Sequence, residues 1–322
     1  MSDILLQVED LHTSFFTRAG EVKAVDGVSF YVREGETFGI VGESGCGKTV
    51  TGLSIIRLLP EPAGQIVGGR VILDGTNLLE LSKKEMRKVR GRMISMILQD
   101  PMTSLNPVYT IGDQIAESVR LHQNLQDSMV EDEVISALRL LQIPAPEARV
   151  RDYPFQMSGG MRQRVVGAIA MSCYPRLLIA DEPTTALDAT IQAQYLALFK
   201  DIQKQTNVSI IFITHDFGVI ANMCHRVAVM YAGKIVETAK TSELFKTPKH
   251  PYTTALINSV PRLDRKDERL YSIEGQPPSL MDLPPGCLFF PRCSEAKEIC
   301  REQQPPEVEI SDGHSVSCWR VS

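Results

Sequence analysis

The sequence contains no apolar run that approaches the roughly 20 residues required to span a lipid bilayer. Residues 1–10 also lack the basic segment and long apolar segment that are typical of a secretory signal. We therefore expect a cytoplasmic protein that reaches a membrane only through partners. Positive charge is not in excess either. The formal net charge of −5 argues against a dedicated nucleic-acid-binding protein.

The remaining composition is ordinary for a soluble globular protein, with 43% hydrophobic and 23% charged residues in a chain of 322. Such a chain can form one large or two modest domains. Seven cysteines are present, and none belongs to the CxxC pair of common zinc sites. Cys173 and Cys224 are expected in the core. Four others crowd the tail, at Cys287, Cys293, Cys300 and Cys318.

Residues 42–49 match GxxxxGK[ST], the pattern of a phosphate-binding loop. The apolar run 37–41 predicts a buried strand before this loop, and the run 51–59 predicts a helix after it. Glycines let such a loop direct backbone N–H groups at phosphate oxygens, and the helix N-terminus favours the same anion. Lys48 is expected to reach the β- and γ-phosphates, and the Thr49 hydroxyl to help hold Mg²⁺. The residues predicted to bind the nucleotide here are Gly42, Glu43, Ser44, Gly45, Cys46, Gly47, Lys48 and Thr49.

A second apolar run, 177–182, predicts a buried strand that ends in two carboxylates. Asp181 is suited to hold the Mg²⁺ shell, directly or through water. Glu182 is suited to orient or deprotonate the attacking water. Upstream, Phe15 or Phe16 could stack on a purine or could belong to the core of a β-sheet, and we favour stacking by Phe15.

The other patterns place these motifs in an α/β fold. Short strands are expected within residues 4–41, followed by further strands at 70–75, 93–98 and 208–214 and a hairpin at 226–238. Amphipathic patterns at 111–121 and 130–141 predict a helical insertion at about 100–157. The basic segment 82–92 could bind nucleic acid, but no aromatics are interleaved, and a solvated helix face is favoured.

Four motifs then stand in one order: GESGCGKT (42–49), Gln99, SGGMRQR (158–164) and LLIADEP (177–183), with His215 beyond. This set resembles the ATPase subunits of ABC transporters. The resemblance implies the P-loop ABC ATPase fold, with an antiparallel β subdomain and a helical subdomain. It also implies two subunits that enclose two ATP molecules, with Mg²⁺. Met157 and Met161 depart from the usual Leu and Gln of the signature.

The resemblance also assigns roles to single residues. Ser158, Gly159 and Gly160 would bind the γ-phosphate held by the partner's loop, as a small-residue helix start can. Gln99 would sense the γ-phosphate and Mg²⁺. His215 would contact the γ-phosphate, and Asp188 would lie at the dimer interface.

Further segments are similar to oligopeptide and dipeptide importers, notably residues 99–115, 250–262, 275–279 and 286–293. In that family two different ATPases pair beneath two permeases fed by an external binding protein. This chain resembles the D-type ATPase at the cytoplasmic face of the membrane. We accordingly expect a nucleotide-binding domain over 1–250 and a cysteine-containing accessory region over 251–322. The solute stays open among dipeptides, longer peptides, nickel chelates and glutathione-like molecules.

The tail spacing, Cys-x5-Cys-x6-Cys-x17-Cys, is compatible with a four-thiolate metal site. Some dipeptide-type members carry a [4Fe–4S] cluster on a similar set, and the resemblance favours that cluster over Zn²⁺ or free thiols. His314 could replace one ligand, although a surface role is favoured for it. Cys46 is expected to have no catalytic role, although its thiol could be reactive.

Two rival functions share parts of this pattern. ABC-type ATPases of DNA repair and chromosome structure insert long coiled coils, but only residues 100–157 separate Gln99 from Ser158, without sustained heptads. Translation members carry two cassettes, whereas this chain has one motif set. The second rival is an iron–sulfur or zinc regulatory protein that uses ATP only as a signal.

Overall fold

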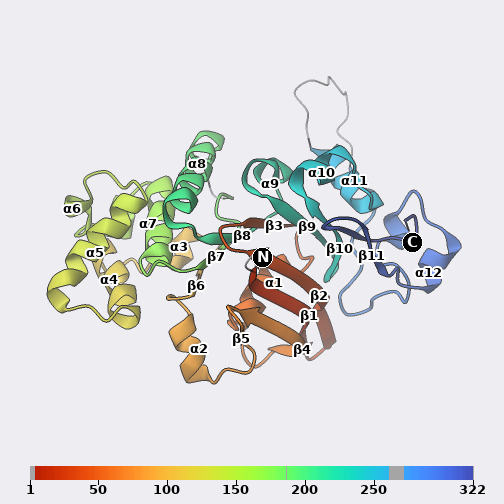
Figure 1. Ribbon diagram of the computed structural model, residues 1–322, viewed down its shortest axis with the longest axis horizontal. Coiled ribbons are helices and arrows are strands. Elements are labelled where there is room, and N and C mark those ends of the chain that lie inside the picture. Colours follow the sequence, from red (N-terminus) through yellow and green to blue (C-terminus); the bar gives the residue numbers. More distant parts are fainter. Residues whose placement is uncertain (1–3, 186, 261–271, 322) are drawn as a thin grey trace. The chain divides into compact units, whose positions relative to one another are not determined.

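The computed structural model describes residues 4–185, 187–260 and 272–321 of the chain (Figure 1). The chain divides into two compact units. Of the described residues, the first unit comprises 4–5, 33–36, 80–185 and 187–211, and the second comprises 6–32, 37–79, 212–260 and 272–321. Ala186 lies outside the described residues, as do Pro261 and Arg262 of the segment 250–262 that is similar to oligopeptide and dipeptide importers.

Parallel strands form the core of the first unit. Strand β6 (Ile94–Ile97) pairs in parallel with β7 (Leu177–Asp181), so that Ile94 lies opposite Leu177. Every residue of β7 is buried, as is typical of a parallel strand covered on both faces. Next to β7 in the sheet order is β8 (Ser209–Thr214), whose residues belong partly to each unit. The predicted strands at 93–98 and 177–182 are therefore confirmed.

The chain between β6 and β7 is helical, as the amphipathic patterns predicted. Its helices are α3 (Pro101–Ser104), α4 (Ile111–His122), α5 (Asp127–Leu140), α6 (Pro146–Arg149) and α7 (Gly159–Met171), with a 3-10 turn at Pro154–Gln156. Helices α4, α5 and α7 lie side by side (Figure 1). They bury apolar residues one helical turn apart, such as Ile115 and Val119 of α4.

Two more helices belong to the first unit, α2 (Lys83–Val89) and α8 (Ala189–Thr206). Helix α2 begins with a capping box between Ser82 and Glu85, and Met86 is its one buried residue. Its basic residues are therefore carried on a solvated helix, which was the favoured interpretation of this segment.

The second unit contains the strand that precedes the phosphate loop. Strand β3 (Thr37–Val41) is fully buried and pairs in parallel with β9 (Arg226–Tyr231), with Ile40 opposite Ala228. The order continues through β10 (Lys234–Lys240) and β12 (His314–Ser317) to β11 (Glu307–Ser311), all antiparallel. The last two strands were not predicted, because the outermost, β11, has no fully buried residue and gives only a weak apolar pattern.

A separate four-stranded antiparallel sheet forms the predicted β subdomain. Its order is β2-β1-β4-β5, built from β1 (Ile4–Thr17), β2 (Gly20–Arg33), β4 (Gly64–Leu73) and β5 (Thr76–Asn77). Strand β4 begins earlier than the predicted segment 70–75, because residues from Gly64 onward pair with β1.

The helices of the second unit are short. They are α1 (Lys48–Ile55), α9 (Phe217–Met223), α10 (Thr241–Lys246), α11 (Pro251–Ser259) and α12 (Glu298–Glu302), with a 3-10 turn at Phe290–Arg292. The predicted limits of α1, residues 51–59, were wrong at both ends. The helix begins directly at Lys48 of the loop and ends at Ile55, and Arg57 then has a left-handed φ of 54°.

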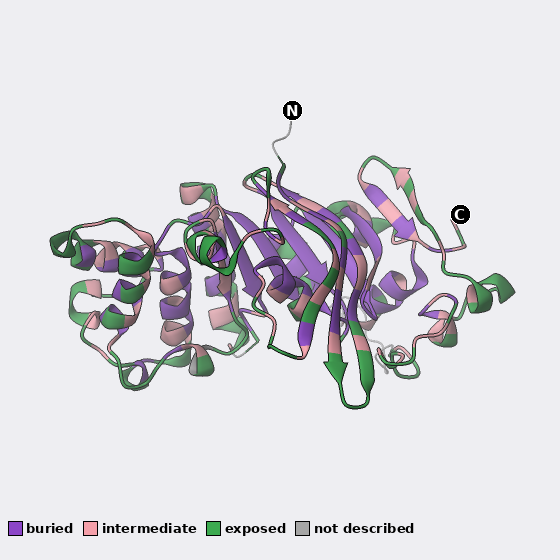
Figure 2. Cartoon of the chain, turned by 90° about the horizontal axis from the view of Figure 1, so that it is seen from below, coloured by how far each residue is buried: buried purple, intermediate pink, exposed green. Residues whose placement is uncertain are grey.

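Buried residues follow the central strands and the inner sides of the helices, while exposed residues line the outer helix faces (Figure 2). None of the described helices is both long enough and apolar enough to cross a membrane.

A leucine of the buried β7 strand provides a test of this core. Leu178 has no exposed surface, so Leu178→Ala should lower the free energy of unfolding by about 2–5 kcal/mol through lost burial and a residual cavity. The matched control is Leu121→Ala, because the side chain of Leu121 is 71% exposed. We expect a lower thermal midpoint for the first variant and an unchanged midpoint for the second. Equal midpoints would contradict this description of β7.

Candidate nucleotide-binding site

The phosphate loop connects the end of β3 to the start of α1, which is the strand–loop–helix arrangement predicted from the sequence. Two of its glycines are required because backbone carbonyl oxygens of other strands lie where a Cβ atom would be. A Cβ atom on Gly42 would lie 2.2 Å from the Met230 carbonyl oxygen, and one on Gly47 would lie 2.3 Å from the Ala24 carbonyl oxygen. Gly47 also has a φ of 107° and is the N-cap of α1. The loop is thus formed against the backbones of β9 and β2.

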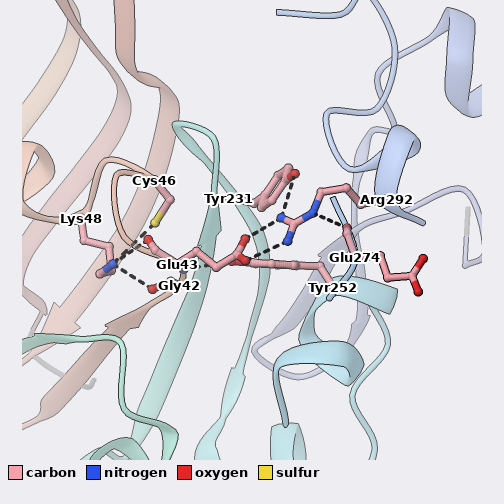
Figure 3. Close-up of polar contacts among 8 residues, drawn as sticks. All are labelled: Gly42, Glu43, Cys46, Lys48, Tyr231, Tyr252, Glu274 and Arg292. Carbon is pink, nitrogen blue, oxygen red and sulfur yellow. Dashed lines mark hydrogen bonds and ion pairs between the residues drawn. The ribbon is translucent and has the colours of Figure 1, made fainter. Parts of the chain in front are cut away.

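Lys48 is buried, with its ammonium group held by the loop itself. Its Nζ donates hydrogen bonds to the carbonyl oxygens of Gly42 at 2.8 Å and Glu43 at 2.9 Å (Figure 3). Thr49 follows as an exposed residue of the first helical turn. A cation and a helix N-terminus at one loop suit a phosphate ligand.

Cys46 lies inside the loop and is 5% exposed. Burial raises the pKa of its thiol, against the opposing effect of Lys48, whose Nζ is 3.8 Å from Sγ. The thiol therefore stays protonated at neutral pH, which disfavours the reactivity weighed for it. Cys173 and Cys224 are buried, as expected.

The second residue of the loop, Glu43, is bound by residues that the sequence analysis did not single out. Its backbone N–H donates to Tyr252 Oη at 3.0 Å. Its carboxylate accepts from Arg292 Nη1 at 2.6 Å and Nη2 at 2.9 Å (Figure 3). The only sequence signal for Arg292 was its place in the segment GCLFFPRC, which carried the family resemblance.

Phe15 and His215 also lie in the second unit. Phe15 is half-buried in β1 opposite Gly64 of β4, whereas the Phe16 side chain is 46% exposed. His215 is exposed between the end of β8 and Asp216, the N-cap of α9. The proposed roles of Phe15 and His215 remain predictions.

The carboxylates of the first unit lie at the end of β7. Asp181 is buried as its last residue, and Glu182 follows with a left-handed φ of 44°, an uncommon conformation for a non-glycine residue. Glu182 Oε2 accepts hydrogen bonds from Gln99 Nε2 and Thr185 Oγ1, both at 3.0 Å. Gln99 and Glu182, predicted separately, are therefore in direct contact.

The small-residue motif forms the start of α7. Ser158 is its N-cap, and its Oγ accepts from the backbone N–H of Met161 at 3.3 Å. A Cβ on Gly159 would have nothing within 4 Å, so the helix start is open. A Cβ on Gly160 would lie 2.9 Å from Ile191 of α8. Asp188 caps α8 by accepting from the N–H groups of Thr190 and Ile191.

The four tail cysteines are brought together. Cys287, Cys293, Cys300 and Cys318 all line one cavity of about 20 Å³, enough for roughly one water molecule. Burial, together with the other three thiols, raises the pKa of Cys287 to about 11. Across the described ranges, however, no group of three or more His, Cys, Asp or Glu side chains is arranged to hold a metal ion. The donors fit a four-thiolate site, but their arrangement does not.

His314 differs from expectation, because it is fully buried and not a surface residue. Its Nε2 is 2.9 Å from Glu237 Oε1, and its Nδ1 is 3.2 Å from Glu243 Oε1. His314 thus contacts two carboxylates inside the protein, on strand β12 where this strand pairs with β10.

Comparison with protein families matches residues 25–185 to the ABC transporter family and residues 236–300 to the oligopeptide/dipeptide transporter C-terminal region. A probable peptide ABC transporter ATP-binding protein of Sinorhizobium fredii is 53% identical over 99% of this chain and 96% of the relative. The Bacillus subtilis dipeptide transport protein DppD and oligopeptide transport protein OppD, both ATP-binding proteins, are each 52% identical over 98% of this chain. The match covers 94% and 88% of those two relatives, respectively.

Solved structures show the same fold. A dimeric post-hydrolysis state of the ATP-binding cassette MJ0796, with ADP and Pi, matches with a TM-score of 0.65 at 23% identity, over 73% of this chain and 98% of that one. Clostridium perfringens cbiO1, part of the ABC transporter complex cbiONQ, also gives 0.65 at 25% identity, over 76% and 91%.

The contact of Gly42 with β9 predicts the effect of one added methyl group. Gly42→Ala should displace the loop from the Met230 carbonyl oxygen and weaken ATP binding by at least about tenfold in a titration with labelled ATP. Gly45→Ala is the comparison, because it introduces backbone strain at a φ of 79° with nothing within 4 Å. We expect a smaller loss there. Unchanged affinity in Gly42→Ala would show that this packing does not determine the loop conformation.

Proposed function

Because the chain belongs to the ABC transporter family of ATP-binding proteins, as an ATP-hydrolysing transporter subunit, we propose that it powers the import of dipeptides or longer peptides. The observation that carries this proposal is full-length similarity, above 50% identity, to proteins named for dipeptide and oligopeptide transport. The match of residues 236–300 to the C-terminal region of such transporters supports it independently of the ATPase motifs.

We propose that the phosphate loop binds the triphosphate of ATP. Its backbone N–H groups would cradle the phosphates, with Lys48 on the β- and γ-phosphates and Thr49 on Mg²⁺. Lys48 Nζ donates to two carbonyl oxygens of the loop, which a phosphate can replace as acceptors. Phe15 would stack on the adenine ring.

In the first unit we propose Asp181 and Gln99 as Mg²⁺-shell residues and Glu182 as the base that orients or deprotonates the attacking water. The support for Glu182 is its fixed conformation, because Gln99 Nε2 and Thr185 Oγ1 both donate hydrogen bonds to its Oε2 atom at the end of β7. His215 would contact the γ-phosphate.

A paralogous ATPase is the proposed partner, joined head to tail with this chain. Ser158, Gly159 and Gly160 would then meet the γ-phosphate bound by the partner, and the open helix start at Gly159 is suited to this contact. Asp188 would lie at the same interface. ATP binding would close the pair and hydrolysis would reopen it, which drives the attached permeases between their two states.

The further proposed partners are two membrane permeases and an external solute-binding protein, with this chain at the cytoplasmic face of the membrane. Nucleic acid is not among the proposed partners, since the net charge is −5 and the most basic segment is a solvated helix.

Replacing the Glu182 carboxylate with an isosteric amide tests the proposal. Glu182→Gln should reduce ATP turnover by about 10²–10⁴-fold, the usual contribution of a general base, while ATP affinity stays within about threefold. Turnover is measured in the assembled transporter, because the proposed partner ATPase would complete the ATP site. Uptake of a labelled dipeptide and a labelled tetrapeptide is measured in cells that carry only the variant.

Glu147→Gln is the matched control, because Glu147 is an exposed carboxylate that pairs with Arg139 of the helical insertion. It should leave turnover and uptake unchanged. Undiminished turnover in Glu182→Gln would remove the assigned role. Lost turnover with normal uptake of both peptides would instead overturn the transport proposal.

We propose that the four tail cysteines are ligands of a [4Fe–4S] cluster. The support is the donor set, four thiols at one cavity, which a cluster of this type uses. A cavity of about 20 Å³ does not hold four irons, so loading would require the cysteine-bearing segments to separate.

Metal analysis of anaerobically purified protein tests this assignment. We expect about four iron and four sulfide ions per chain, together with the visible absorption of such a cluster. Cys293→Ser should lose both, whereas Cys224→Ser, at a buried cysteine outside the tail, should retain both. Zinc in place of iron, or no metal at all, would refute the cluster.

A further inference from the structure

An ion pair joins the phosphate loop to the C-terminal tail. The Arg292 guanidinium donates two hydrogen bonds to the Glu43 carboxylate, one to each oxygen (Figure 3). The Arg292 side chain is 3% exposed and that of Glu43 is 27% exposed. Such bidentate, charge-assisted contacts fix orientation as well as proximity.

Arg292 is itself firmly placed. Its Nε donates to the Glu274 carbonyl oxygen at 3.1 Å, and Nη1 also contacts Tyr231 Oη at 3.4 Å. The guanidinium carbon lies 5.8 Å from the Tyr231 ring centre and 6.0 Å from that of Phe289. Hydrogen bonding to Glu43 raises the pKa of Arg292, so the guanidinium is always charged.

Glu43 holds Lys48 through its backbone, not through its carboxylate. The Glu43 carbonyl oxygen accepts from Lys48 Nζ, while its side chain extends away from Lys48 toward Arg292 (Figure 3). If the carboxylate turned back, it would be an anionic acceptor only a few atoms from the ammonium group. It would then compete with phosphate for Lys48 and repel the triphosphate.

We propose that Arg292 is a positioning residue for ATP binding, which keeps the Glu43 carboxylate neutralised and away from Lys48. The arginine lies in the 3-10 turn Phe290–Arg292, between Cys287 and Cys293. The tail that identifies the transporter class thereby contributes to the phosphate site. This inference rests on ATP binding by the loop and is independent of which solute is transported.

The test is a rescue experiment on the full-length chain, with ATP affinity measured by titration with labelled ATP. Arg292→Met should weaken binding about tenfold, because the Glu43 carboxylate is released. Glu43→Gln is the reference for the double variant, because it removes the carboxylate and keeps the backbone groups of the loop. The double variant should bind like Glu43→Gln, because no carboxylate is left to compete. Arg292→Lys, which keeps one charge, should stay within about threefold of the wild type.

The matched control is Arg320→Gln, since Arg320 is also a tail arginine in an ion pair, with Glu295, away from the loop. It should leave ATP affinity unchanged. A merely structural role for Arg292 predicts that the double variant binds as weakly as Arg292→Met, and this result would overturn the proposal. Wild-type affinity in Arg292→Met would overturn it as well. Thermal midpoints identify any variant that fails to fold. If Arg292→Met does not fold, Arg292→Lys decides: an affinity within about threefold of the wild type supports the proposal, and a loss of tenfold or more overturns it.

Discussion

The phosphate loop depends on two backbone contacts in which no side chain can fit. Gly42 lies against the Met230 carbonyl oxygen and Gly47 against that of Ala24. The Met230 carbonyl belongs to β9, which pairs with β3, and the Ala24 carbonyl belongs to β2, so the loop conformation depends on contacts with two other strands. The inward direction of the loop N–H groups is therefore a consequence of sheet order as well as of glycine content.

Local features of the fold could be predicted from the sequence because they depend on neighbouring residues. The buried strands β3 and β7 are uninterrupted apolar runs, and the helical insertion has an amphipathic period. The prediction was wrong for α1, whose apolar residues extend beyond Ile55 while its backbone does not, since Arg57 turns left-handed. Strand β11 was missed because an exposed edge strand needs few apolar residues.

For the candidate site, too, the sequence indicated single motif residues but not the contacts between distant ones. The motif residues were predicted one by one, and the structure brings Gln99 and Glu182 into direct contact, while their chemical roles stay predictions. The contact between Glu43 and Arg292 could not be predicted, since 249 residues separate them and neither has a periodic neighbour that indicates the other. Long-range ion pairs leave no local pattern, and here only the family resemblance pointed to the tail segment.

A glutamate at the second position of an anion-binding loop is unfavourable unless its charge is compensated, since like charges within a few ångströms repel strongly where water is excluded. Lysine could supply the charge but not the planar fork that engages both carboxylate oxygens and lies beside aromatic rings. Arg292 supplies both the positive charge and the planar fork, and it lies in a turn flanked by Cys287 and Cys293. The order of the cysteine-bearing segment and the charge balance at the phosphate loop are thus coupled. Displacement of the turn would leave the Glu43 carboxylate uncompensated near Lys48.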